Sequence, residues 1–571
     1  MKKYILPILI VCFVLFSFVP TFYELGRSAD LPGNRSFELI HNYITDYNFY
    51  LSRIREGWDG RTTLLEIYTN EPHHGTIIHE LYLVLGRMAR FISNAAVAVP
   101  YAYHAARFVF GLFLLSLIAR VATRLIHTPF WQVLAFLVVV TSAGYPNVSL
   151  VGNSWRFNNF MPWWTVLEPL QRLTFVPHIL LAQCGLLFLI IFGSDPDTLG
   201  KKGNWIFLSI IAMGTGLVMP QALMMVYGVF IIETLFEFIF WQGKKDTQHI
   251  SEWMKHSVYP RMGIVLLSVW TILYFLPLLR VYPWKRLVDF ETLHPIAFSY
   301  IEYLKTLGFS LPLGIIGGFF VLKQKDRAWY PIVAWALGVV GLVFAMTIVP
   351  LQHPLRFTEM AAYIPLGLLT AYFFHQLILK ISNSRLPARQ VKFQIRVMRQ
   401  YAIMFVYSLC FLSIVYGCIA MYHQFLWQKD FTDQKVAAGW PVIAMDNYIV
   451  YPSKDFIDGI LYIDASTPKN AVILSAIVAG NYIPARTGRV VYLGHENTSY
   501  KEEKVEIVKQ FYSGLMEQKA CYLWLHKEGI SYVFWGPQEH EVGGEADIAA
   551  KYPFLREVYK NTEVTVYQVT P

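Results

Sequence analysis

Residues 1–22, MKKYILPILIVCFVLFSFVPTF, decide the fold class, because Lys2 and Lys3 precede an apolar run from Tyr4 to Phe22 that contains no charged residue. About 20 apolar residues suffice for a helix to cross the hydrocarbon core of a bilayer. A signal peptide has a shorter apolar core and ends at a small-residue cleavage site, which this run lacks. We therefore expect an uncleaved first membrane helix that enters from the cytoplasmic side.

Similar apolar stretches recur as far as Tyr422, and the whole chain is 55% hydrophobic and only 15% charged. Soluble domains carry roughly 25% charged residues. The pattern predicts a polytopic α-helical membrane protein with about eleven transmembrane helices, judged by the length that a bilayer requires. The expected spans are 4–22, 95–119, 129–143, 175–193, 204–219, 221–241, 262–281, 311–322, 329–349, 361–381 and 401–423.

The distribution of lysine and arginine orients these spans. Starting with the N-terminus inside, basic residues collect in the inner loops, as the positive-inside rule requires. The short outer loops hold few: Arg156, Arg172, Lys285, Arg286, Lys305 and Arg356. This topology places loop 23–94 and the C-terminal tail outside the cytoplasm. It also explains the net charge of +9, so we predict no nucleic-acid partner.

Two domains are expected. Residues 1–428 form the transmembrane domain, which includes the first extracytoplasmic loop, 23–94. Residues 429–571 form an extracytoplasmic mixed α/β domain, because alternating or β-branched runs at 469–475, 489–493, 530–535 and 564–567 predict strands. Helical spacing over 501–528 predicts the accompanying helix.

The first candidate for chemistry is Asp46, in the outer segment Ile44-Thr45-Asp46-Tyr47-Asn48-Phe49-Tyr50. A carboxylate at the water–lipid boundary can deprotonate an acceptor hydroxyl or hold a metal beside a phosphate. The alternative is a structural helix N-cap, since aspartate is a favoured cap before an apolar-periodic run.

A second cluster, Glu71-Pro72-His73-His74-Gly75, combines a carboxylate with imidazoles. Such side chains suit a divalent metal, and we predict Glu71, His73 and His74 as ligands of Mg²⁺ or Mn²⁺. Their spacing matches no established metal motif, so a polar loop leading into an interfacial helix at 76–92 is the alternative.

The outer basic residues Arg356, Arg172, Lys285 and Arg286 are candidates for binding a lipid phosphate, which an arginine fork suits well. The alternative is that they extend to ordinary phospholipid headgroups.

At this point the chain resembles the GT-C superfamily of integral membrane glycosyltransferases. The resemblance rests on four features: Asp46-Tyr47 with Tyr50-Leu51-Ser52, Tyr68–Pro72 leading to Tyr82–Arg90, Phe175-Val176-Pro177-His178, and an outer tail containing Thr467–Ile473 and Gly529–Gly536. It implies a GT-C-like fold, a polyprenyl-phosphate-sugar donor, transfer on the outer face with inversion, and Asp46 as catalytic base. Tyr50 and His178 join the expected substrate-binding residues.

Two departures refine the expectation. Loop 23–94 has no Asp-x-Asp pair, and Trp163-Trp164 is followed by Thr165, not by aspartate. Transfer of a single sugar is therefore expected in preference to transfer of a whole oligosaccharide.

The sequence predicts a glycosyltransferase of the bacterial inner membrane that passes a sugar to a lipid, glycan or protein acceptor. The alternatives are a polysaccharide or lipid transporter, and a non-catalytic membrane protein whose tail binds the cell envelope. The transferase interpretation requires Asp46 and Arg356 to face one outer cavity.

Overall fold

The computed structural model describes residues 4–240, 247–293, 296–348, 352–383, 392–438, 450–544 and 546–570. The basic residues Lys2, Lys3, Lys244, Lys245, Arg385 and Arg389, which the predicted topology places inside, lie outside these ranges. The chain divides into two compact units. Unit 1 comprises Met1–Val19, Arg107–Ile272 and Ala297–Trp427, and unit 2 comprises Pro20–Ala106, Leu273–Ile296 and Gln428–Pro571.

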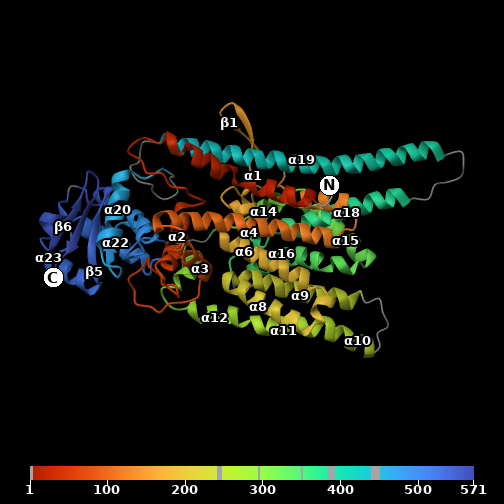
Figure 1. Cartoon of the computed structure of the whole chain (residues 1–571), viewed down its shortest axis with the longest axis horizontal. Helices are drawn as coiled ribbons and strands as arrows, with labels where there is room; N and C mark the ends of the chain where they lie inside the picture. Colours follow the sequence, from red (N-terminus) through yellow and green to blue (C-terminus); the bar gives the residue numbers. More distant parts are fainter. Residues whose placement is uncertain are drawn as a thin grey trace. The chain divides into compact units, whose positions relative to one another are not determined.

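Unit 1 is a helical bundle (Figure 1). Helix α15 packs against α18, α9 packs against α16, and α8 packs against α11. Helix α6 packs on both α8 and α9. Its elements, four of which continue into unit 2, are α1 (Ile5–Arg27), α4 (Ala95–Leu125), α5 (Pro129–Val140), β1 (Val148–Val151), β2 (Ser154–Phe157), η3 (Thr165–Leu167), η4 (Gln171–Thr174), α6 (Pro177–Gly193), α7 (Pro196–Leu199), α8 (Lys202–Val218), α9 (Pro220–Ile239), α10 (Thr247–Trp253), η5 (Met254–Val258), α11 (Tyr259–Ser268), α12 (Trp270–Leu278), α14 (Tyr300–Thr306), α15 (Ser310–Gln324), η6 (Arg327–Trp329), α16 (Tyr330–Ile348), α17 (Leu355–Thr358), α18 (Tyr363–Asn383) and α19 (Lys392–Ala437).

The helices are those of a multi-pass membrane protein. Within the described ranges, seven helices are long and apolar enough to cross a bilayer, or eight if the pair α14 and α15, bent by 78°, is one span. The helices α5, α6 and α8 are apolar but shorter. Helices therefore occupy every position where the sequence predicts a span, while the number of crossings stays a prediction.

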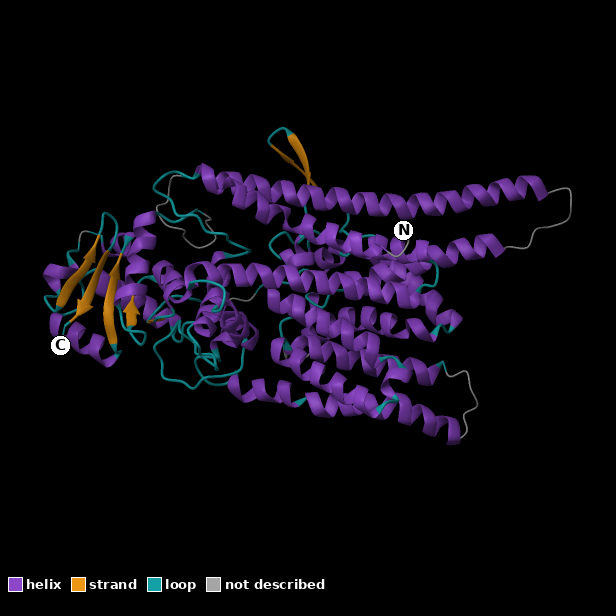
Figure 2. Ribbon diagram, in the orientation of Figure 1, coloured by secondary structure: helices purple, strands orange, loops and turns teal. Residues whose placement is uncertain are grey.

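Unit 2 is built on a five-stranded mixed sheet with strand order β4-β3-β5-β7-β6 (Figure 2). Strand β3 runs parallel to β4 and β5, and β7 runs antiparallel to β5 and β6. The elements of unit 2 are η2 (Ser28–Asp30), α2 (Ile44–Trp58), α3 (Glu80–Ala89), α13 (Arg286–Leu293), α20 (Lys454–Ser466), β3 (Val472–Leu474), α21 (Ile477–Thr487), β4 (Val490–Val491), α22 (Lys501–Tyr512), α23 (Gln518–Lys527), β5 (Ile530–Trp535), α24 (Pro537–Gly543), α25 (Ile548–Lys551), β6 (Leu555–Lys560) and β7 (Thr565–Val569).

Loop 23–94 and the C-terminal tail share one hydrophobic core. Ile54 and Tyr82 of the loop pack in the same buried cluster as Ile460, Ile473 and Phe534 of the tail. This grouping differs from the expected division, which placed loop 23–94 with the transmembrane domain. The physical reason is that the buried face of α2 needs an apolar partner, which α21 of the tail supplies.

The strands predicted in the tail are present as β3, β4, β5 and β7, and the predicted helical segment 501–528 contains α22 and α23. Strand β6 was not predicted. Among the described strands, it pairs with β7 alone, at the edge of the sheet, and it carries Arg556, Glu557 and Lys560. Charged residues are typical of edge strands and weaken the alternating apolar pattern from which strands are predicted.

Candidate active site

Helix α2 is held firmly in unit 2 from both ends. Near its start, the Asn48 side chain donates to Oδ1 of Asn481 in α21 at 2.8 Å, and Asn481 donates to the Thr45 carbonyl at 3.3 Å. Near its end, Gly57 lies against the backbone of α3, where a Cβ would overlap the Leu83 carbonyl. A side chain on the first turn of α2 therefore stands on a rigid support.

Asp46 is the third residue of α2 and its side chain is 52% exposed. The residue at the N-cap is Tyr43, and the cap position makes no side-chain hydrogen bond. The N-cap alternative is therefore wrong. A carboxylate within the first turn lies near the partial positive charge of the helix start.

A histidine of the tail faces this carboxylate. His495, whose side chain is 6% exposed, places Nε2 at 3.9 Å from Oδ1 of Asp46. Its Nδ1 accepts the backbone N–H of Asn497 at 3.1 Å, so the ring carries its proton on Nε2, toward Asp46. Among the described residues, Nε2 makes no hydrogen bond.

The His495 ring lies against two aromatic side chains. It stacks on Phe49 with ring centroids 4.9 Å apart and packs on Tyr68 at 5.2 Å. Burial, together with the positive charges of Arg53 and Lys501, lowers the pKa of His495 to about 3. His495 is therefore neutral at physiological pH, and its Nε2 carries a proton that it can donate.

Buried charges fix the middle of α2. The fully buried Arg53 forms an ion pair with Glu66 at 2.5 Å, and its guanidinium lies 4.2 Å from the centroid of the Phe49 ring. Its Nη1 also donates to the Leu65 carbonyl at 2.9 Å. Arg53 thus connects the chain after α2 to the aromatic support of His495.

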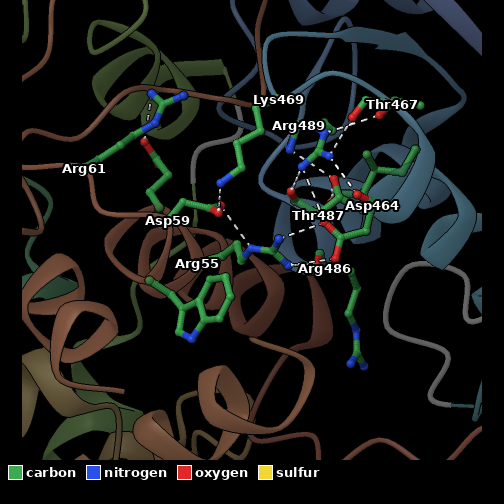
Figure 3. Close-up of polar contacts among 12 residues, drawn as sticks. Arg55, Asp59, Arg61, Asp464, Thr467, Lys469, Arg486, Thr487 and Arg489 are labelled. Atoms are coloured by element: carbon green, nitrogen blue, oxygen red, sulfur yellow. Dashed lines mark hydrogen bonds and ion pairs between the residues drawn. The ribbon is translucent and has the colours of Figure 1, made fainter. Parts of the chain in front are cut away.

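A second polar network joins the end of α2 to the tail (Figure 3). Arg55 contacts Asp464 of α20 at 2.8 Å and Asp59 at 3.0 Å. Lys469 reaches the other oxygen of Asp59 at 2.8 Å, and Arg489 contacts Asp464 at 3.4 Å. These contacts explain why loop 23–94 and the tail form one compact unit.

The predicted metal ligands are used in other ways. His73 donates from Nδ1 to the Glu71 carbonyl at 2.7 Å and accepts the Glu66 N–H at Nε2 at 2.8 Å. The Glu71 carboxylate pairs with Lys504 at 3.1 Å, and His74 is exposed. Within the described part of the chain, no three His, Cys, Asp or Glu side chains are grouped to hold a metal. The set Glu71, His73 and His74 therefore does not fit a divalent metal.

Three predicted binding residues of unit 2 have protein partners. Tyr50 stacks on Tyr82 with centroids 4.9 Å apart. Lys285 pairs with Asp289 at 2.6 Å. Arg286 is buried and donates to both carboxylate oxygens of Glu502, at 3.0 and 2.7 Å. Arg286 therefore joins α13 to α22, and its guanidinium is already occupied by a carboxylate.

In unit 1, the structure brings together two predicted residues, Arg356 and His178, which interact electrostatically. Arg356 lies on the short helix α17, is 40% exposed, and approaches the buried Glu359 at 3.7 Å. Gln183, from α6 like His178, donates to the Glu359 carbonyl at 2.7 Å. In this group the Arg356 guanidinium is half-exposed, whereas Glu359 and Gln183 are buried.

Arg172, also in unit 1, is buried. Its Nη2 donates to the carbonyls of Val140 and Ser142 at 3.2 and 2.6 Å, and its guanidinium lies 3.8 Å from the centroid of the Tyr363 ring. These contacts stabilise the end of α5, where carbonyls lack helical partners.

His495 and Asn481 are functional candidates that the sequence interpretation missed. Both follow predicted strands, since α21 comes after β3 and the loop with His495 comes after β4. Binding residues concentrate beyond the carboxyl ends of parallel strands, so the predicted strand 489–493 carried a signal for the histidine that follows it.

No protein-family model matches the chain, and no curated protein matches its sequence. Solved structures do match. The apo oligosaccharyltransferase of Archaeoglobus fulgidus aligns with a TM-score of 0.51 at 12% identity, covering 100% of this chain and 75% of that one. The apo ArnT of Cupriavidus metallidurans aligns with a TM-score of 0.49 at 11% identity, covering 98% of this chain and 97% of that one.

The likeness to the Archaeoglobus protein is one of fold, because so few residues are identical. It extends over the full length of the chain. This chain therefore shares the fold of the Archaeoglobus fulgidus oligosaccharyltransferase.

Proposed function

We propose that this protein is a membrane glycosyltransferase that moves a sugar from a polyprenyl-phosphate carrier to a lipid, glycan or protein acceptor. The observation that carries the proposal is the half-exposed Asp46 carboxylate on helix α2, which a buried histidine of the tail faces. The fold shared with an oligosaccharyltransferase supports the same chemistry.

In this proposal, Asp46 is the general base. Its carboxylate takes the proton of an acceptor hydroxyl while the hydroxyl oxygen attacks the anomeric carbon. The bond between that carbon and the phosphate oxygen breaks, and the polyprenyl phosphate leaves with the electron pair. General bases of this kind contribute about 10²- to 10⁴-fold in rate.

Arg356 is proposed to bind the carrier phosphate, with His178 beside it. A guanidinium suits a phosphate because its donors match two oxygens, and Arg356 is exposed enough to receive one. Arg286 and Arg172 are left out of this role, because Glu502 and backbone carbonyls hold their guanidinium groups. The proposal assigns no ligands to Mg²⁺ or Mn²⁺, and either ion is only added to or left out of the assay buffer.

The proposal includes the location. Eleven crossings with the N-terminus inside would place loop 23–94 and the tail on the outer face of a bacterial inner membrane. The positive-inside distribution of the sequence supports this arrangement.

Incubation of the purified protein with radiolabelled undecaprenyl-phosphate hexoses and a cell-envelope extract tests the function. The proposal predicts release of undecaprenyl phosphate together with a labelled acceptor that appears only with the protein. A transporter or a non-catalytic envelope-binding protein would leave the sugar–phosphate bond of every donor intact, and that result would overturn the proposal.

A further inference from the structure

We infer that His495 is a positioning residue for Asp46: a neutral imidazole N–H, supplied by the tail, orients the carboxylate for proton abstraction. This inference rests on the proposed function. It gives the tail domain a direct part in the reaction, which neither the fold nor the sequence assigns to it.

The first support is the geometry of the ring. The hydrogen bond from the Asn497 N–H fills the Nδ1 lone pair, which leaves Nε2 as the protonated nitrogen. That nitrogen is buried, makes no hydrogen bond within the described ranges, and lies 3.9 Å from Asp46 Oδ1. Hydrogen bonds at a catalytic site are often long before the substrate binds, so this separation suits a contact that shortens during the reaction.

The second support is the rigidity of the histidine loop. The Thr498 hydroxyl accepts the backbone N–H groups of Gly494 and His495 at 3.3 and 3.2 Å, and donates to the Tyr68 carbonyl at 2.8 Å. Gly480 and Gly494 lie so close that a Cβ on either would overlap the backbone of the other segment. Phe49 and Tyr68 then fix the plane of the ring.

The third support is the charge of the surroundings. Arg53 and Lys501 oppose a positive charge on His495, while Asp46 faces it across 3.9 Å. Glu496 pairs with Lys501, and Glu66 pairs with Arg53. A neutral donor orients the carboxylate without the strong stabilisation that an imidazolium would give its ionised form, so Asp46 keeps its strength as a base.

Two substitutions separate this role from simple packing. His495→Phe keeps a ring between Phe49 and Tyr68 but removes the donor. His495→Gln keeps a side-chain N–H at a similar reach. His540→Phe is the matched control, because His540 belongs to the same unit and its ring packs on Trp535 at 4.6 Å.

The readout is the steady-state kinetics of sugar transfer over a range of pH. For His495→Phe we expect kcat to fall by about 10- to 100-fold, because a misplaced catalytic group costs that much, with the donor KM unchanged. Its acidic pH limb should move to higher pH, since the carboxylate loses a donor that favours its ionised form. His495→Gln should recover most of kcat and the position of the limb, and His540→Phe should match the wild type.

The outcomes distinguish the two proposals. An active wild type whose His495→Phe variant keeps kcat and the same acidic limb would overturn the positioning role alone. The same holds if His495→Gln is as impaired as His495→Phe while both fold. An inactive wild type would overturn the proposed function, and the role of His495 with it.

Discussion

Replacing Arg53 with methionine tests whether the buried ion pair stabilises the packing of loop 23–94 in unit 2. Arg53 and Glu66 are 0% and 2% exposed, and their charged atoms are 2.5 Å apart. Methionine replaces the guanidinium-bearing side chain with an apolar one of similar shape. The Glu66 carboxylate then stays buried without its cation.

The expected loss can be estimated from this burial. Breaking a buried ion pair by removing one partner costs about 3–5 kcal/mol, because the other charge stays desolvated. Arg61 provides the control, since it contacts Glu56 at 3.4 Å, as Arg53 does, but its side chain is 33% exposed. The buried Glu56 keeps its contact with Arg53 when Arg61 is removed, so Arg61→Met leaves no buried carboxylate without a cation and should change little.

Thermal unfolding of the purified protein in detergent, followed by intrinsic fluorescence, measures both variants. We expect Arg53→Met to lower the apparent unfolding temperature by about 10 °C. Adding Glu66→Gln should recover much of the loss, because it removes the unpaired charge. The reasoning is refuted if Arg53→Met and Arg61→Met lose the same small amount, or if Glu66→Gln makes the first variant worse.

Two further predictions concern the same unit. A Cβ on Gly86 of α3 would overlap the Ile54 carbonyl of α2, whereas a Cβ on the control residue Gly26 would meet nothing within 4 Å. Gly86→Ala should therefore lower the unfolding temperature by more than Gly26→Ala. Equal unfolding temperatures for the two variants would contradict the close approach of α2 and α3. His495 is buried neutral with a pKa of about 3 against an ordinary value of 6.5, so its contribution to stability is present above pH 6.5 and is lost as the pH falls toward 3. Between pH 6.5 and 5 the wild type should lose about 2 kcal/mol more than His495→Gln, and parallel stability curves for the two proteins would contradict the burial of a neutral ring.

The helical part of the fold could be predicted because membrane helices depend on local composition. A run such as Ile5–Phe22 must satisfy its backbone hydrogen bonds internally within lipid, so its length and apolarity determine its structure. The strands β3 and β5 were predictable for a similar reason, since their apolar residues are continuous in sequence.

The shared core of the first loop and the tail could not be predicted in this way. It depends on pairs such as Asn48 with Asn481 and Arg55 with Asp464, whose members are far apart in the chain. A single sequence does not indicate such pairs. Asp46 could be selected from its own segment, but its pairing with His495 could not, because only the folded tail brings the two together.

The predicted metal set shows the limit of reasoning from residue type. Glu71, His73 and His74 have the right donors. The two nitrogens of His73 are however used by the Glu66 N–H and the Glu71 carbonyl, and the Glu71 carboxylate pairs with Lys504. Arg286 is a similar case: its guanidinium is suited to a phosphate but pairs with Glu502.

Comparison of Asp46→Asn with Asp30→Asn in the undecaprenyl-phosphate-hexose assay tests the central claim most directly. The two carboxylates belong to one unit and have nearly equal exposure, 52% and 53%. If Asp46 is the general base, Asp46→Asn should lower kcat by about 10²- to 10⁴-fold while the protein unfolds at the wild-type temperature, and Asp30→Asn should stay near the wild-type rate. A folded Asp46→Asn protein that transfers sugar as fast as Asp30→Asn would contradict the assignment of Asp46 as the catalytic base.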